Sequence, residues 1–464
     1  MRRNILIVLA LLGGASEPLR AEKLAIVGGT LIDVRDGGRS TADITAATVL
    51  LDGDRIVAAG PSKDVRIPPG TRRVDARGRF IVPGLIDGFG SVRSQGFASA
   101  YLYEGVTTVF LPEPSGADTR RGKPLLTASP APRLFLGSVV TSYGQTDRSD
   151  TPMQEHRLND VRLTRAEMTA LLEKLRAGGA RAVLIHYDTW PDDVDWIVRE
   201  TRRLGMGTIG ELGWTGYHYA ARAGVQSFVH SSRYLVELTP PDLWLAYGDQ
   251  PFGRAVGPAL DAAADVDPAG PAVERYGNFL AGARATLMPT LAMQLTSARH
   301  GLPNPWRRPS AVLVQPEELH NPTDRETGLA PLGQRTPEMI ARRQAQFAKL
   351  VRQDARLHTL GVRYLAASGC SAFGIMPGGG MHLEMAVLHD EIGLSPREAL
   401  AAATSNYADA FGWSDVGRVE PGRAADVVIV KRDPRTDVHA VEDIDVVIAR
   451  GRLIDRPALL RPPR

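Results

Sequence analysis

The chain has 464 residues, of which 43% are hydrophobic and 23% are charged, as is ordinary for a globular protein of one large or two medium domains. The formal net charge is only +3, and this balance gives no reason to expect a nucleic-acid partner. Cys370 is the only cysteine, so an intramolecular disulfide is excluded and the fold must depend on its own hydrophobic core.

Residues 1–21 have the composition of a secretory signal peptide. Arg2 and Arg3 precede the apolar run from Ile5 to Leu12, and small residues follow it. We therefore expect a protein exported to the periplasm or the extracellular space, with cleavage just before Glu22 or, alternatively, after Ala15. A bilayer span needs roughly 20 apolar residues, and because no other stretch approaches that length we expect no transmembrane segment.

Short apolar runs between turn residues dominate both ends of the mature chain. In residues 22–82 they include "KLAIVGGTLID" and "TVLLDGDRIVAAG", in which Asp52-Gly53 predicts a hairpin turn. Residues 414–464 show the same pattern in "VGRVEPGRAADVVIVKRDP" and "IDVVIARGRLID". Because neither segment holds enough strands to bury a face alone, we expect both to form one small β-sandwich.

Residues 83–413 alternate helical windows with short apolar strands. Thr164 and Glu167 form a capping box at the start of "TRAEMTALLEKLRAGG", which leads into the strand "RAVLIHYD". Thr336 and Pro337 open a second helix, which leads into "VRYLAAS". The repeated order predicts an α/β fold and favours a (β/α)8 TIM-like barrel over an open sheet, although periodicity alone does not separate the two.

Eight short motifs stand along the chain in a characteristic order. They are "GGTLIDV", "LLDGDRIVAAG", "IVPGLID", "EGVTTV", "RAGVQSFVHSS", "LMPTLAM", "LSPREALAAATSNYADAFG" and "VGRVEPGRAADVVIV". With these motifs the chain resembles the amidohydrolase superfamily, in particular its imidazolonepropionase-like and prolidase-like secreted members. The resemblance implies a barrel that carries a small β-sandwich made from both termini.

The resemblance also implies where the metal-site residues of active members would fall. Those members use a His-x-His pair, a lysine on the fourth strand, histidines on the fifth and sixth strands and an aspartate on the eighth. The corresponding positions, in that order, are Phe89, Ser91, Leu184, Gly210, His230 and Cys370. Only His230 keeps the expected residue type. Since phenylalanine and leucine cannot bind a divalent cation, the resemblance implies a degenerate metal site, and we expect no cofactor.

Two interpretations of the predicted barrel mouth stay open. In the first, the protein is metal-poor and hydrolytically impaired, and it binds a small molecule or a partner subunit at the barrel mouth. The partner would be a second copy of the chain or an active paralogue. His230 is then a hydrogen-bonded relic ligand and Cys370 an inert buried thiol.

In the second interpretation, the protein hydrolyses amide, cyclic amide or dipeptide bonds with a rebuilt site. His186 lies two residues beyond Leu184 and therefore on the same strand face, and Glu211 adjoins the missing fifth-strand ligand. With His230 and Cys370 these side chains offer nitrogen, oxygen and sulfur ligands that zinc accepts. His230, Cys370 and Glu211 are also the candidate catalytic residues, because a thiolate beside an imidazole is a nucleophile.

Overall fold

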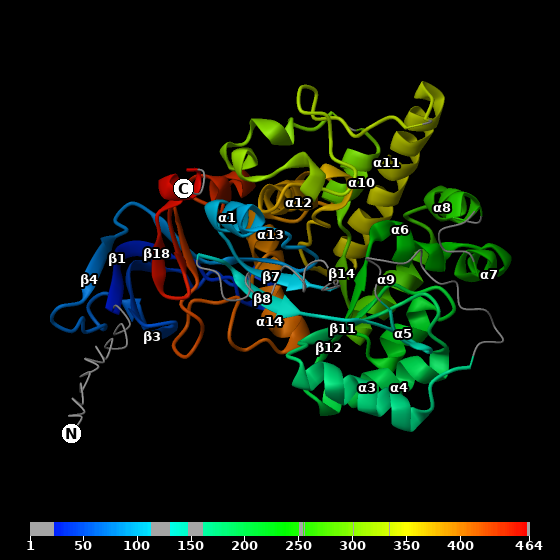
Figure 1. The fold of residues 1–464 in the computed structure, drawn as a ribbon, viewed down its shortest axis with the longest axis horizontal. Helices are drawn as coiled ribbons and strands as arrows, with labels where there is room; N and C mark the ends of the chain where they lie inside the picture. The colour runs from blue at the N-terminus through cyan, green and yellow to red at the C-terminus, as the bar shows by residue number, and fades with distance from the viewer. Residues whose placement is uncertain are drawn as a thin grey trace, which may run out of the picture.

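The computed structural model describes residues 23–112, 130–146, 161–249, 254, 256–299, 301–333 and 335–461 (Figure 1). The expected signal peptide, residues 1–21, lies outside these ranges. No helix in the described part of the chain is both long and apolar enough to cross a membrane.

Strands from both ends of the chain form one eight-stranded sheet, whose order is β18-β17-β16-β5-β1-β2-β3 with β4 beside β1. β5 and β16 pair antiparallel, with Val82 opposite Val428, so the two ends meet at the centre of the sheet. Figure 1 shows the blue and red strands together at one end of the molecule. The predicted association of the two ends is therefore observed, whereas the two-sheet sandwich stays a prediction. The strands are β1 (Lys23–Leu31), β2 (Ile44–Asp52), β3 (Arg55–Pro61), β4 (Arg72–Asp75), β5 (Phe80–Pro83), β16 (Val427–Val430), β17 (Ile444–Ala449) and β18 (Arg452–Ile454).

Alternating side chains of this sheet fill its core, as the period of two of a strand requires. Leu24 and Ile26 of β1, Val49 and Leu51 of β2 and Ile429 of β16 are buried together. The predicted hairpin is present, since Asp52 pairs with Arg55 across a turn that contains Gly53 at φ 57°. Arg55, in the edge strand β3, also forms an isolated antiparallel bridge with Ala424, which precedes β16 of the same sheet. The sheet therefore curls.

The middle of the chain forms two further sheets. The three-stranded sheet has the order β6-β7-β8, and the seven-stranded sheet has the order β10-β9-β11-β12-β13-β14-β15. All of their pairs are parallel except that between β9 and β10. The strands are β6 (Leu85–Asp87), β7 (Val106–Leu111), β8 (Arg133–Leu136), β9 (Val139–Thr141), β10 (Gly144–Thr146), β11 (Ala182–Ile185), β12 (Gly207–Gly210), β13 (Ser227–Val229), β14 (Thr286–Met288) and β15 (Arg363–Tyr364).

Helices alternate with these strands, and the predicted caps are present. Thr164 and Glu167 form the capping box of α3, and the Thr336 hydroxyl accepts the Met339 N–H at the start of α11. The helices are α1 (Gln95–Tyr103), α3 (Arg165–Ala177), α4 (Pro191–Arg203), α5 (Tyr217–Ala223), α6 (Ser231–Tyr234), α7 (Pro241–Asp249), α8 (Val256–Asp265), α9 (Pro271–Ala283), α10 (Leu291–Ser297), α11 (Pro337–Thr359), α12 (Gly379–Asp390), α13 (Pro396–Ala402), α14 (Ser405–Phe411) and α15 (Arg456–Leu459).

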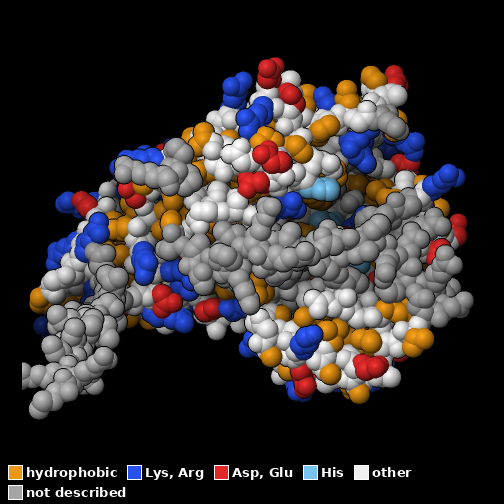
Figure 2. Space-filling view, in the orientation of Figure 1, with side chains coloured by type: hydrophobic (Ala, Val, Ile, Leu, Met, Phe, Trp, Pro, Cys, Tyr) orange, Lys and Arg blue, Asp and Glu red, His pale blue; other side chains and the backbone are white. Residues whose placement is uncertain are grey.

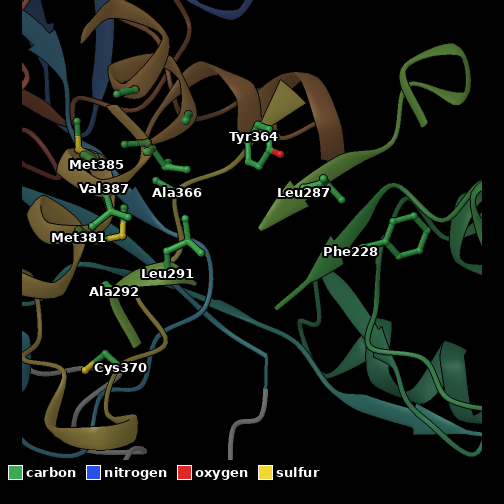
Figure 3. Packing of buried hydrophobic residues seen from close by; sticks show 14 of the residues in the cluster. Phe228, Leu287, Leu291, Ala292, Tyr364, Ala366, Cys370, Met381, Met385 and Val387 are labelled. Carbon is green, nitrogen blue, oxygen red and sulfur yellow. The ribbon is translucent and has the colours of Figure 1, made fainter. Parts of the chain in front are cut away.

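The two middle sheets share one interior core. It contains an inward side chain from each of β6, β7, β8, β9, β11, β12, β13 and β14, together with Leu365 just after β15. The outer faces of the two sheets pack on the helices, and Figure 3 shows part of that packing, with Ala366 near Met385 and Val387 of α12. The fold is therefore α/β. The strands of the described residues form two separate ladders, so closure into a (β/α)8 barrel stays a prediction.

Candidate functional site

A cavity of about 1180 Å³ lies at the carboxyl ends of the parallel strands. Its lining includes the segments that follow β6, β12, β13 and β15, and side chains of α8, α10 and α11 form further walls. Glu317 and Glu318 of the 3-10 turn Pro316–Glu318, together with His320, add polar groups. Figure 2 shows histidine side chains, in pale blue, at a recess between the upper and lower parts of this face. Ends of parallel strands are where α/β folds bind ligands.

His230 and Glu211 face one another in the cavity. His230 follows β13, Glu211 follows β12, and the His230 Nε2 lies 3.8 Å from the Glu211 Oε1. The other ring nitrogen, Nδ1, lies 2.7 Å from the Thr290 Oγ1, and the Thr290 hydroxyl donates its own proton to the Pro289 carbonyl oxygen. The Thr290 oxygen must therefore accept, which assigns a proton to Nδ1 and directs Nε2 toward Glu211.

Glu211 is held by groups that the sequence did not identify. The Tyr187 hydroxyl donates to the Glu211 Oε1, and the Arg233 Nε lies 4.0 Å from the same oxygen. The Arg233 guanidinium also lies over two rings, at 5.3 Å from the Tyr187 centroid and 5.7 Å from that of Tyr247. Burial raises the pKa of Tyr247 to about 12, so this ring stays neutral beside the cation. The carboxylate charge of Glu211 is thus balanced within the protein.

Phe89 occupies the side of His230 where the resemblance implies a histidine ligand. The two rings meet edge to face, with centroids 5.1 Å apart and planes at 69°. Phe89 also packs against the interior core. Both Phe89 and Ser91 line the cavity. An apolar ring therefore stands beside the one histidine that remains of the expected ligand set.

Leu184 and Gly210, which we assigned to the former ligand positions, do not line the cavity. Leu184 is fully buried in the interior core below it. Gly210 points outward, since a Cβ there would lie 2.8 Å from the Phe228 ring. The period of two explains this placement: Ile209 points inward, so Glu211 and not Gly210 is the next inward side chain. Glu211 is therefore the residue that this strand end brings to the cavity.

His186 is buried and is not among the residues that line the cavity. Its Nδ1 lies 3.9 Å from the Asp188 Oδ1, and its ring contacts that of Tyr187 at a centroid distance of 4.3 Å.

Cys370 lines the cavity, but its sulfur is hydrogen-bonded to the Tyr101 hydroxyl and the Ser91 backbone amide. Burial raises the pKa of the thiol to about 12, and those hydrogen bonds and the nearby Arg93 charge offset this only in part. The thiol is therefore protonated at neutral pH. It is not in the thiolate form, which is the nucleophile.

The rebuilt zinc site is not assembled. Among the described residues, no three His, Cys, Asp or Glu side chains converge on a point where a metal ion could bind. The reason is local: Phe89 lies beside His230, Tyr187 and Arg233 engage Glu211, and Cys370 bonds to Tyr101. The residues present do not fit the metal that the resemblance implies.

The chain is similar to known proteins in both sequence and fold. The sequence model of the family described as "Amidohydrolase family" matches residues 308–454. The imidazolonepropionase of Symbiobacterium thermophilum is 27% identical over 471 residues, which cover 94% of this chain and 98% of that protein. The adenine deaminase of Paracoccus denitrificans is 36% identical over 92 residues, but the match spans only 15% of its length and 19% of this chain.

Two solved structures are similar across most of the chain. A Xaa-Pro dipeptidase with bound methionine in its active site has a TM-score of 0.60 at 18% identity, covering 93% of this chain and 100% of that one. The bottromycin amidohydrolase has a TM-score of 0.65 at 20% identity, covering 94% of this chain and 87% of that one. At these identities the likeness concerns the fold.

Proposed function

The chain belongs to the amidohydrolase superfamily, and from that premise we propose that it is an exported protein that binds a small molecule in its cavity and lacks metal-dependent hydrolysis. The observation that carries the proposal is the edge-to-face contact between Phe89 and His230. We further propose that the two middle sheets form a (β/α)8 barrel and that the terminal sheet is its β-sandwich.

The side chains around His230 offer too few ligands for zinc. Zinc sites in proteins use sulfur, imidazole nitrogen and carboxylate oxygen, and a single histidine holds the ion poorly. A phenyl ring at van der Waals distance would remove hydration from a divalent cation and supply no ligand, which is unfavourable by several kcal/mol by ordinary burial arguments. Glu211, the nearest carboxylate to His230, is already hydrogen-bonded to Tyr187 and faces Arg233.

The cavity nevertheless keeps the features of a binding site. Its volume of about 1180 Å³ accommodates a small molecule. Met293, Phe347 and Leu350 supply apolar lining, and Glu211 and His230 supply polar groups. A ligand could thus bury an apolar part and satisfy a few directional hydrogen bonds.

An active hydrolase of carbon-nitrogen bonds is the second candidate. The observation that favours it is the 3.8 Å approach of the His230 Nε2 to Glu211, because an imidazole beside a carboxylate can move a proton during acyl transfer. This candidate would need a nucleophile from solvent, since the Cys370 thiol is protonated at neutral pH.

An activity assay separates the two candidates. The mature chain, purified with zinc present, is incubated with N-acyl amino acids, dipeptides and cyclic amides. We expect no turnover, together with a raised melting temperature for some members of the panel. Turnover that His230→Ala abolishes, and that His439→Ala at an exposed histidine of the terminal sheet unit leaves intact, would establish the hydrolase instead.

We also propose that residues 1–21 are removed on export. If the chain binds a protein partner, we propose that this partner is a second copy of the chain or an active paralogue. N-terminal sequencing of secreted material tests the first point, because retention of Ile5 to Leu12 would contradict it.

A further inference from the structure

We propose that Arg93, Ser91 and Ser371 form a subsite that binds the carboxylate of the ligand, so that an anion lies beside a position where active relatives hold a metal ion. This inference rests on the proposed binding function and names the chemical class of the ligand: a small molecule with a carboxylate group and an apolar part.

The three residues lie together because two backbone segments meet there. The Gly369 N–H donates to the Phe89 carbonyl oxygen at 3.0 Å, and the Ser91 amide is hydrogen-bonded to the Cys370 sulfur. Ser371 follows directly on that second segment, and its carbonyl oxygen accepts the His320 N–H at 3.1 Å. All three proposed subsite residues line the cavity.

Arg93 brings a positive charge to the cavity. Within the described residues, no carboxylate oxygen lies within 4.0 Å of its guanidinium. Two of the cavity carboxylates are engaged elsewhere, since Glu211 faces Arg233 and Glu318 accepts the Gln315 N–H at 3.0 Å. A half-buried guanidinium presents a planar set of donors that matches the two oxygens of a carboxylate.

The cavity lining also includes two serines whose hydroxyl oxygens are buried. In the part of the chain that the structure describes, the buried Oγ atoms of Ser91 and Ser371 make no hydrogen bond. Serine hydroxyls rotate freely and can each donate one bond to a ligand oxygen. Leaving a buried hydroxyl unpaired is unfavourable, so a bound carboxylate would satisfy both groups and Arg93 together.

The two serines differ from an ordinary polar wall in one measurable respect. Because their hydroxyls make no hydrogen bond among the described residues, Ser91→Ala and Ser371→Ala should leave the melting temperature of the free protein unchanged or raise it. The same substitutions should weaken carboxylate binding severalfold. Serines with a purely structural role would give the opposite result, a lower melting temperature with unchanged binding.

Benzoate and benzamide are a matched pair of probes, because they share an apolar ring and differ in charge. Binding is measured by calorimetry on the full mature chain. We expect benzoate to bind and benzamide to bind at least 10-fold more weakly. Arg93→Gln should lower benzoate affinity by roughly 10-fold or more. Arg77→Gln is the control, since Arg77 is exposed, pairs with Asp75 in the sheet formed by the two chain ends and does not line the cavity, and it should keep the wild-type affinity.

Three results would overturn the subsite. They are equal binding of the two probes, wild-type benzoate affinity in Arg93→Gln, and absence of any benzoate binding. Preferential binding of inorganic phosphate would overturn the assignment to a carboxylate. The inference and the proposed function fail separately, because turnover would refute only the latter, and benzamide binding that Arg93→Gln does not change would refute only the former.

Discussion

The phenyl ring of Phe89 meets the imidazole of His230 edge to face at a centroid distance of 5.1 Å. The ends of β6 and β13, which lie in different sheets and at which the resemblance implies two metal ligands, are joined here by an apolar contact. His230 is instead oriented through its Nδ1 by Thr290, and Glu211 is oriented by Tyr187. The polar groups at these two strand ends are thus engaged by other side chains of the protein.

Phe89→Ala should lower the free energy of unfolding by about 2 kcal/mol, because the partly buried ring packs on both His230 and the interior core. Urea denaturation measures this value. Leu245→Ala is the control, since that side chain is 62% exposed, and it should change stability by less than about 0.5 kcal/mol. An equally small effect of Phe89→Ala would mean that the ring is not packed as described.

Cys370 should react slowly with an aromatic disulfide reagent at pH 7, because burial raises the pKa of its thiol to about 12. The reaction should become fast in denaturing urea, which serves as the internal control for reagent and thiol. Fast labelling of the native protein at pH 7, slowed by His230→Ala, would show instead that the imidazole activates the thiol.

Glu384 should make the protein less stable as pH rises from about 4.5 to about 8. Burial raises the pKa of this carboxyl from 4.5 to about 8, while its Oε2 accepts the Ala292 N–H at 2.7 Å. The native state therefore holds a proton that the unfolded chain releases, so the stabilisation is complete below pH 4.5 and is lost as pH passes 8. Glu384→Gln mimics the protonated carboxyl and should flatten the pH dependence of the unfolding free energy over this range.

Glu317→Gln, at an exposed glutamate of the cavity rim, is the matched control for that experiment and should keep the wild-type slope. If Glu384→Gln shows the same slope as the wild type, Glu384 titrates normally and the account of its burial is wrong.

Arg233 and Glu211 should be strongly coupled. Arg233→Met leaves the buried Glu211 carboxylate without its nearest cation and should lower the free energy of unfolding by about 3 kcal/mol. Adding Glu211→Gln removes that charge and should recover part of the loss. For comparison, Lys23→Met, at the exposed pair of Lys23 and Asp52, should have an effect below about 0.5 kcal/mol. Strict additivity in the double variant would show that the two side chains do not interact.

Much of the fold could be predicted because its signals are local. The capping box at Thr164 and the hairpin at Asp52 depend on residues a few positions apart. The joining of the two chain ends was predictable because neither end could bury a sheet face alone. The helix and strand order of the middle followed from hydrophobic period, while the sequence could not decide between a closed barrel and separate sheets.

The site was harder to predict because strands stop being regular where they end. His230 has a φ of 66°, so side-chain alternation no longer holds at that position. Counting back along the sequence from the motif around His230 predicts Gly210 as the ligand position. The alternation of side chains within β12 instead directs Glu211 into the cavity. Arg233 offered one usable signal, since an arginine three residues after a cavity histidine reaches the same cavity. Thr290 offered none, because its contact with His230 spans 60 residues.

Elemental analysis of the mature protein tests the central claim most directly. The protein is produced with zinc available and dialysed extensively before zinc is counted per chain. The contact of Phe89 with His230 and the engagement of Glu211 predict well under one zinc ion per chain, with a melting temperature that a chelator does not change. One or more zinc ions per chain after dialysis, lost in His230→Ala, would contradict the account.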